Sequence, residues 1–129
     1  KGVTFVNDSK GTNVDATIKA LESFTQPVVV ILGGQGKGSD FSRLRDALKG
    51  HAKSMVLIGE ATESIARAVA ECGKIQRASS LAHAVELAER QASSGEVVLL
   101  SPACASFDMF RDYLDRGQQF RDLVNALPA

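Results

Sequence analysis

The feature that most constrains the fold is a continuous apolar run, Val28 to Leu32, which breaks at Gly33-Gly34. β-Branched residues without polar alternation indicate a strand buried on both faces, as in a parallel sheet. Glycines after such a strand let the backbone turn sharply and let a ligand approach the main chain. Because ligands of open α/β sheets bind just outside the carboxyl ends of the strands, the run predicts a site at its tip, which Lys37 would face.

The rest of the chain alternates between strand and helix patterns. Further short strands are predicted over residues 3–6, 54–58 and 96–100 and around Ile75. Apolar residues at helical spacing predict helices over residues 13–24, 41–50, 65–72, 81–94, 107–114 and 120–127, with a cap at Ser79-Ser80 and an interruption at Gly117. The alternation predicts a single α/β domain over residues 1–129. Its sheet would be doubly wound and mostly parallel, with about five to six strands flanked by helices, a Rossmann-like fold.

Composition narrows the functional classes. Fifteen basic and fifteen acidic residues cancel, which argues against a nucleic-acid-binding module. The sequence has no run of eighteen apolar residues, so no membrane span is predicted. Two cysteines do not make a disulfide framework, and a reduced cytosolic compartment fits them best.

Three loops should open on one edge of the sheet, at residues 7–13, 33–39 and 101–106. The middle loop, Gly-Gly-Gln-Gly-Lys-Gly-Ser, lacks the spacing of a P-loop and of the dinucleotide-binding glycine motif. Lys37 is therefore interpreted in two ways. It is either a solvated lysine in a flexible turn or a clamp for a carboxylate or phosphate at the start of the following helix.

The first and last loops carry weaker signals. Asp8 and Lys10 could serve a ribose and a phosphate, or form a solvated turn. In the last loop Ser106 is predicted to cap a helix that starts at Phe107.

The cysteines and histidines predict no reactive centre. Cys104 is interpreted as a small buried thiol, because no histidine is placed locally to activate it. His51 and His83 have no metal-ligand spacing with each other or with the cysteines, so no metal site is predicted in this chain.

The loop motifs occur in a characteristic order. They are Asn-Asp-Ser-Lys-Gly-Thr-Asn at 7–13, Gly-Gly-Gln-Gly-Lys-Gly-Ser-Asp-Phe at 33–41, and Leu-Ser-Pro-Ala-Cys-Ala-Ser at 100–106, followed by Asp108, Phe110 and Arg116-Gly117. Together they resemble the carboxyl-terminal domain of the Mur ligases, most closely the D-glutamate-adding type. The departures are mild: Gly11 replaces a frequent Ala, Phe107 a frequent Leu and Tyr113 a frequent Phe.

The resemblance implies a cytoplasmic step of peptidoglycan synthesis. Such enzymes use ATP and Mg²⁺ to phosphorylate the carboxylate of UDP-N-acetylmuramoyl-L-alanine, and the amine of D-glutamate attacks the acyl phosphate. By the same resemblance, Lys37 would bind the side-chain carboxylate of D-glutamate. Thr12, Ser106 and Phe107 would surround the amino acid, and Tyr113 would pack nearby. Asp8 would meet the ribose of the nucleotide and Lys10 its phosphates.

The resemblance also implies missing parts. The family's P-loop, magnesium ligands and UDP site lie in a central ATPase domain and an amino-terminal domain. We therefore expect this chain to be a piece of a three-domain enzyme, to contain no catalytic residue and to be inactive alone. The alternatives are another amide ligase, such as a folylpolyglutamate synthase-like enzyme, and a non-catalytic flavodoxin-like binding module.

Overall fold

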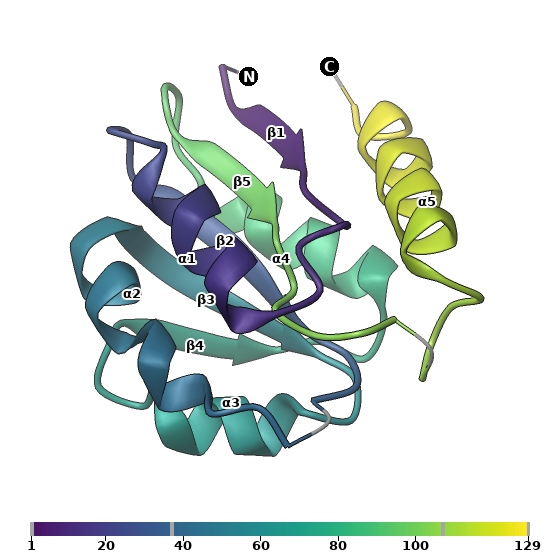
Figure 1. Ribbon diagram of the computed structural model, residues 1–129. Coiled ribbons are helices and arrows are strands. Elements are labelled where there is room, and N and C mark those ends of the chain that lie inside the picture. The colour runs from purple at the N-terminus through teal and green to yellow at the C-terminus, as the bar shows by residue number, and fades with distance from the viewer. Residues whose placement is uncertain (1, 37, 107, 129) are drawn as a thin grey trace.

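The strands form one parallel sheet with helices on both faces (Figure 1). The computed structural model describes residues 2–36, 38–106 and 108–128. Within them the strand order is β1-β5-β2-β3-β4, and each neighbouring pair is parallel. The strand bounds are β1 Thr4–Asn7, β2 Val28–Gly33, β3 Ala52–Ile58, β4 Lys74–Arg77 and β5 Val97–Leu100. The predicted fold class is confirmed, and the sheet has five strands over the described residues.

Helices cover the two faces unequally. One face carries α1 (Val14–Glu22), the 3₁₀ helix η1 (Phe41–Leu44), α2 (Arg45–His51) and α3 (Thr62–Ala68), and the other carries α4 (Leu81–Gln91) and α5 (Tyr113–Asn125). No helix of the described residues is both long and apolar enough to cross a membrane.

The central strand β2 is buried on both faces, as its apolar run predicts. Val28, Val30 and Leu32 pack in the cluster under α1, α2 and α3. Val29 and Ile31 pack in the cluster under α4 and α5. Successive side chains of a strand point to opposite faces, so an uninterrupted apolar run is what a doubly covered strand requires.

Side chains cap the starts of α1 and α4, and the cap at Ser80 was predicted from the sequence. The side chain of Asn13 accepts a hydrogen bond from the Ala16 N–H (2.9 Å) at the start of α1. Ser80 Oγ accepts from the His83 N–H (3.0 Å) at the start of α4. Each bond satisfies an amide that the first helical turn leaves free.

The prediction for the carboxyl-terminal helices is wrong. Residue 107 lies outside the described residues, and residues 108 to 112 form turns and bends in place of the predicted helix. The Ser106 carbonyl accepts bonds from the amides of Met109 and Phe110 in such a turn, so Ser106 caps no helix there.

Helix α5 instead begins at Tyr113 and continues through Gly117. A Cβ at Gly117 would lie 3.1 Å from Asn7 Nδ2, and the Gly117 carbonyl accepts a bond from that nitrogen (3.2 Å). The glycine therefore marks a close approach between α5 and the end of β1. Close backbone contact is a tertiary use of glycine that local sequence does not distinguish from a helix break.

Candidate functional site

The three predicted loops converge at the carboxyl edge of the sheet, toward which the strand arrows of Figure 1 point. Backbone hydrogen bonds join them directly. The Ala103 amide donates to the Gly11 carbonyl (2.9 Å) and the Gly33 amide to the Pro102 carbonyl (2.9 Å). Gln35 and Ala105 form an antiparallel bridge. The last loop therefore lies between the other two and bonds to both.

A fourth segment, which sequence reasoning did not identify, also lies at this edge. The Ala61 amide donates to the Gly34 carbonyl (2.9 Å), and the Glu60 amide donates to Asp108 Oδ2 (3.0 Å). A Cβ at Gly59 would lie 2.6 Å from the same carboxylate oxygen. The loop after β3 thus packs against both the glycine loop and the segment before α5.

A buried serine holds Asp8 in place. Ser101 Oγ donates to Asp8 Oδ2 (2.8 Å), and Thr17 Oγ1 donates to the Ser101 carbonyl (3.0 Å). Ser101 and Thr17 are both fully buried. The orientation of the Asp8 carboxylate is therefore set from the protein interior.

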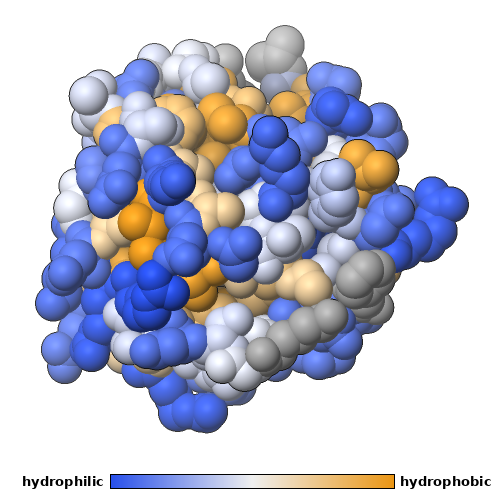
Figure 2. All heavy atoms as spheres, in the orientation of Figure 1, coloured by the Kyte–Doolittle hydropathy of each residue, from blue (hydrophilic) through white to orange (hydrophobic). Residues whose placement is uncertain are grey.

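Asp8 and Lys10 open onto one groove, of about 560 Å³, between α1 and the end of β1. Its polar rim also includes Lys19, and its floor is apolar, with Val6, Ala16, Ala20, Phe24 and Leu99. Figure 2 views the molecule from the side of α1, α2 and α3, and hydrophobic residues are visible there in hollows between hydrophilic ones. A carboxylate acceptor beside two ammonium groups over an apolar floor suits a ligand with hydroxyl, anionic and flat apolar parts.

Thr12 and Ser106 lie on two adjoining loops. The Thr12 amide donates to the Lys10 carbonyl (2.8 Å), so Thr12 belongs to the tight turn that carries Lys10. Ser106 is buried, directly after the bridge residue Ala105. Thr12 and Ser106, two of the predicted amino-acid-binding residues, are thus carried by loops that bond to one another at Gly11 and Ala103.

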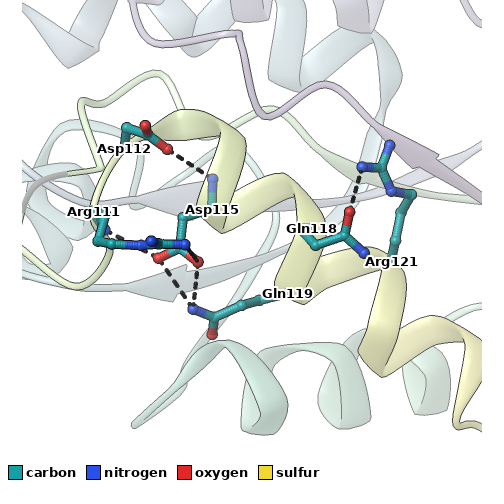
Figure 3. Close-up of polar contacts among 6 residues, drawn as sticks. All are labelled: Arg111, Asp112, Asp115, Gln118, Gln119 and Arg121. Atoms are coloured by element: carbon teal, nitrogen blue, oxygen red, sulfur yellow. Dashed lines mark hydrogen bonds and ion pairs between the residues drawn. The ribbon is translucent and has the colours of Figure 1, made fainter.

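Tyr113 begins α5 beside the first loop. The residue is 43% exposed, its neighbour Leu114 is 65% exposed, and both line a small hollow with Lys10. Figure 3 shows the start of this helix, where Asp112 accepts from the Asp115 amide (2.8 Å) and Asp115 also accepts from the Arg111 amide (3.0 Å). Bonds to Arg111 and Gln119 lower the pKa of the Asp115 carboxyl.

Sequence reasoning named Arg116 only as part of the family motif and assigned it no role, whereas in the structure it is completely buried. Its Nε donates to Ser9 Oγ (3.0 Å), its Nη2 to the Ser9 carbonyl (2.6 Å) and its Nη1 to the Cys104 carbonyl (3.1 Å). Burial lowers the pKa of Arg116 to about 10, so the guanidinium remains charged at neutral pH. One signal was present in the sequence: Arg116 lies four residues before Phe120, on the apolar face of its helix.

Cys104 is buried beside this guanidinium. Burial raises the pKa of its thiol to about 12, so the thiolate needed for nucleophilic attack is absent at neutral pH. The interpretation of Cys104 as a small buried thiol is confirmed.

Two predicted site residues, Lys37 and Phe107, lie outside the described residues. The structure thus places five members of the predicted set, which are Asp8, Lys10, Thr12, Ser106 and Tyr113. All five lie on the loops, or the helix start, at the carboxyl edge.

Comparison with known proteins gives one consistent result. Residues 1–104 match the family model described as "Mur ligase, glutamate ligase domain". The chain is 53% identical over 129 residues to the UDP-N-acetylmuramoylalanine--D-glutamate ligase of Marinobacter nauticus, covering 98% of this chain and 29% of that protein. Proteins of the same name from Acinetobacter baylyi (50% identity, 97% and 30% covered) and Desulfitobacterium hafniense (48%, 96% and 28%) also match. The chain therefore spans less than a third of the length of these curated relatives.

Proposed function

The chain belongs to the Mur ligase family through its glutamate ligase domain, and from this membership we propose that it is the amino-acid-binding domain of a D-glutamate-adding ligase. The full-length protein would join D-glutamate to UDP-N-acetylmuramoyl-L-alanine in an ATP-dependent, cytoplasmic step of peptidoglycan synthesis. The observation that carries the proposal is about 50% identity, across nearly the whole chain, to proteins named for that reaction. Residues 1–129 would be one domain of a larger enzyme.

We assign the amino acid to the loops at 33–39 and 101–106 and the turn at Thr12. Lys37 would pair with the side-chain carboxylate of D-glutamate, and Thr12, Ser106, Phe107 and Tyr113 would surround the molecule. The hydrogen bonds between the loops support this assignment, because they hold Thr12 and Ser106 on adjoining segments. The exposed ring of Tyr113 supports it too, because that ring is available to a ligand or a neighbouring domain.

We assign part of the nucleotide to Asp8 and Lys10. The side chains of their groove fit such a ligand: the Asp8 carboxylate can accept from ribose hydroxyls, and Lys10 and Lys19 can face phosphates. ATP would supply the phosphoryl group that activates the acceptor carboxyl. Its Mg²⁺ ligands are expected in the central ATPase domain, which is not part of this chain.

The contribution of this domain to the reaction would be to position the amine of the amino acid. Bringing an amine into line with an activated carboxyl group needs accurate positioning more than acid–base groups, and well-oriented reactants can gain several kcal/mol in this way. Ammonium groups at the same edge would offset the negative charge that develops on phosphate oxygens. We therefore propose that the domain closes over the ATP site, carries no catalytic residue itself and has no ligase activity when isolated.

The test measures phosphate release by the full-length protein with ATP, UDP-N-acetylmuramoyl-L-alanine and a panel of amino acids. We expect D-glutamate alone to stimulate release. Lys37→Ala should raise the KM for D-glutamate by about tenfold or more, the scale of a lost charge-assisted bond. Lys49→Ala is the matched control, because Lys49 is an exposed lysine in the last turn of α2, away from the loops.

Each alternative predicts a different result. Stimulation by another amino acid would keep the ligase and reject D-glutamate. No stimulation by any amino acid would favour a non-catalytic binding module. An unchanged KM in Lys37→Ala would reject the role of that lysine while leaving the reaction in place.

A further inference from the structure

We propose that Arg116 is a positioning residue that holds the two ligand loops at a fixed spacing, so that nucleotide and amino acid bind in register. This inference rests on the proposed function for the identity of the ligands. Arg116 itself is fully buried and is not expected to touch either ligand.

The three bonds of Arg116 join elements far apart in the sequence. The guanidinium donates twice to Ser9, in the first loop, and once to the Cys104 carbonyl, in the last loop. Ser9 Oγ in turn donates to the Tyr113 carbonyl (2.6 Å), at the start of α5. One side chain therefore links both loops and the helix that carries Tyr113.

The anchored residues adjoin the proposed ligand contacts. Ser9 lies between Asp8 and Lys10, and Cys104 lies two residues before Ser106. A shift or loss of the guanidinium would therefore change the position of the two sets relative to each other. Placement errors of about 1 Å can reduce turnover about a hundredfold.

The chemistry of the guanidinium explains why this link needs an arginine. All three acceptors are uncharged oxygens, and among the described residues Arg116 makes no ion pair. The Asp108 carboxylate attracts the guanidinium but forms no ion pair with it, and a buried charge without a paired carboxylate is costly, so charge pairing alone does not account for this arginine. The rigid, planar guanidinium with its several N–H donors does account for it, because this group fixes both the directions and the distances of its acceptors.

The first test compares Arg116→Lys with wild type in the full-length protein. Lysine keeps the charge but loses the planar guanidinium. We expect the KM for D-glutamate to rise about tenfold, with a lower kcat, at a temperature where the variant is folded. Arg90→Lys, an exposed arginine in the last turn of α4, is the matched control and should behave as wild type.

The second test is hydrogen–deuterium exchange of the same full-length proteins without ligands. Amides of residues 8–12 and 103–106 should exchange faster in Arg116→Lys, whereas those of β3 and α4 should not change. If Arg116→Lys does not fold, Ser9→Ala takes its place, since it removes only the hydroxyl that links Arg116 to Tyr113. We expect a smaller KM increase there, about threefold.

The outcomes separate this proposal from the proposed function. Faster loop exchange together with a raised KM supports the positioning role. Faster exchange throughout the domain, or faster loop exchange with an unchanged KM, overturns it in favour of a purely structural role. If wild-type protein releases no phosphate with any amino acid, the proposed function fails, and unchanged loop exchange in Arg116→Lys would then also overturn the positioning role.

Discussion

The two edges of the sheet are held together in different ways. At the carboxyl edge, buried side chains such as Arg116 and Ser101 bond to loops about a hundred residues away in sequence. At the opposite edge, where the strands begin, side-chain contacts lie nearer to solvent. The Lys53 ammonium pairs with Glu96 Oε1 (2.7 Å), with 35% and 17% of the two side chains exposed. Glu96 also accepts from the nearby Ser93 amide (2.7 Å).

This difference indicates where the domain can tolerate substitutions. Bonds in a buried network leave unsatisfied partners when one member is removed, whereas water replaces a lost partner at the surface. We therefore expect mutations at the carboxyl edge to cost both stability and function, and mutations at the opposite edge to cost little of either. Four predictions test this contrast, in order of decreasing effect.

Gly33→Ala should cause the largest loss. Gly33 has φ of +134°, and an added Cβ would lie 1.9 Å from the Ile58 carbonyl oxygen in the neighbouring strand. Neither the left-handed backbone nor the β3 main chain can adjust cheaply, so we expect a loss of about 3–5 kcal/mol in the free energy of unfolding. Urea denaturation measures it.

The control for this prediction is Gly50→Ala, in α2 near the opposite edge. A Cβ there meets no atom within 4 Å, and a helical alanine should stabilise by about 0.5–1 kcal/mol. Equal effects of the two substitutions would break the contrast between the edges.

Arg116→Met should cause the second largest loss. It removes the donor from three acceptors on Ser9 and Cys104, and it also removes the cost of burying a charge. We expect the balance to be a destabilisation of about 2–3 kcal/mol, measured by urea denaturation. A variant as stable as wild type would show that the guanidinium serves positioning alone.

Ser101→Ala should cost less, about 1–2 kcal/mol, because it removes one hydroxyl that donates to Asp8. Freed from this bond, the Asp8 carboxylate should lose its fixed orientation. We expect the KM for ATP of the full-length protein to rise, while the KM for D-glutamate changes little. The reverse pattern would place Asp8 on the amino acid instead of the nucleotide.

Glu96→Gln should have the smallest effect. The hydrogen bond from Lys53, followed by that from the Ser93 amide, lowers the pKa of the Glu96 carboxyl. A lowered folded-state pKa contributes stability above the ordinary glutamate value of about 4.3, and the contribution disappears as the pH falls through the lowered value. The wild-type advantage in Tm should therefore be small near pH 7, weaker in high salt, and absent at a pH below both values. An advantage that grows on acidification would contradict this assignment.

The sequence predicted much of the carboxyl edge through local signals. The apolar run of β2 identified the central strand, and the loops that follow β1, β2 and β5 were expected on one edge. Parallel strands place their carboxyl ends together, so their common edge follows from the strand pattern alone. The cap at Ser80 was predictable because a cap acts within one helical turn.

The errors concern the last quarter of the chain. A helix was expected at residue 107 and an interruption at Gly117, whereas α5 begins at Tyr113 and continues through the glycine. In both places a tertiary contact determined the local backbone structure. Asp108 turns toward the Glu60 amide, and Gly117 lets the helix approach Asn7. Neither partner is near in sequence, so local propensity did not reveal them.

The sequence by itself determined most elements of this protein, because strand burial, helix period and capping depend on neighbouring residues. It also determined the family, because the loop motifs occur in order along one chain. Only the tertiary structure decided that Arg116 joins Ser9, 107 positions away, to Cys104 beneath the candidate site. A guanidinium finds its acceptors through the spacing of packed strands and helices, and that spacing exists only once the sheet has assembled.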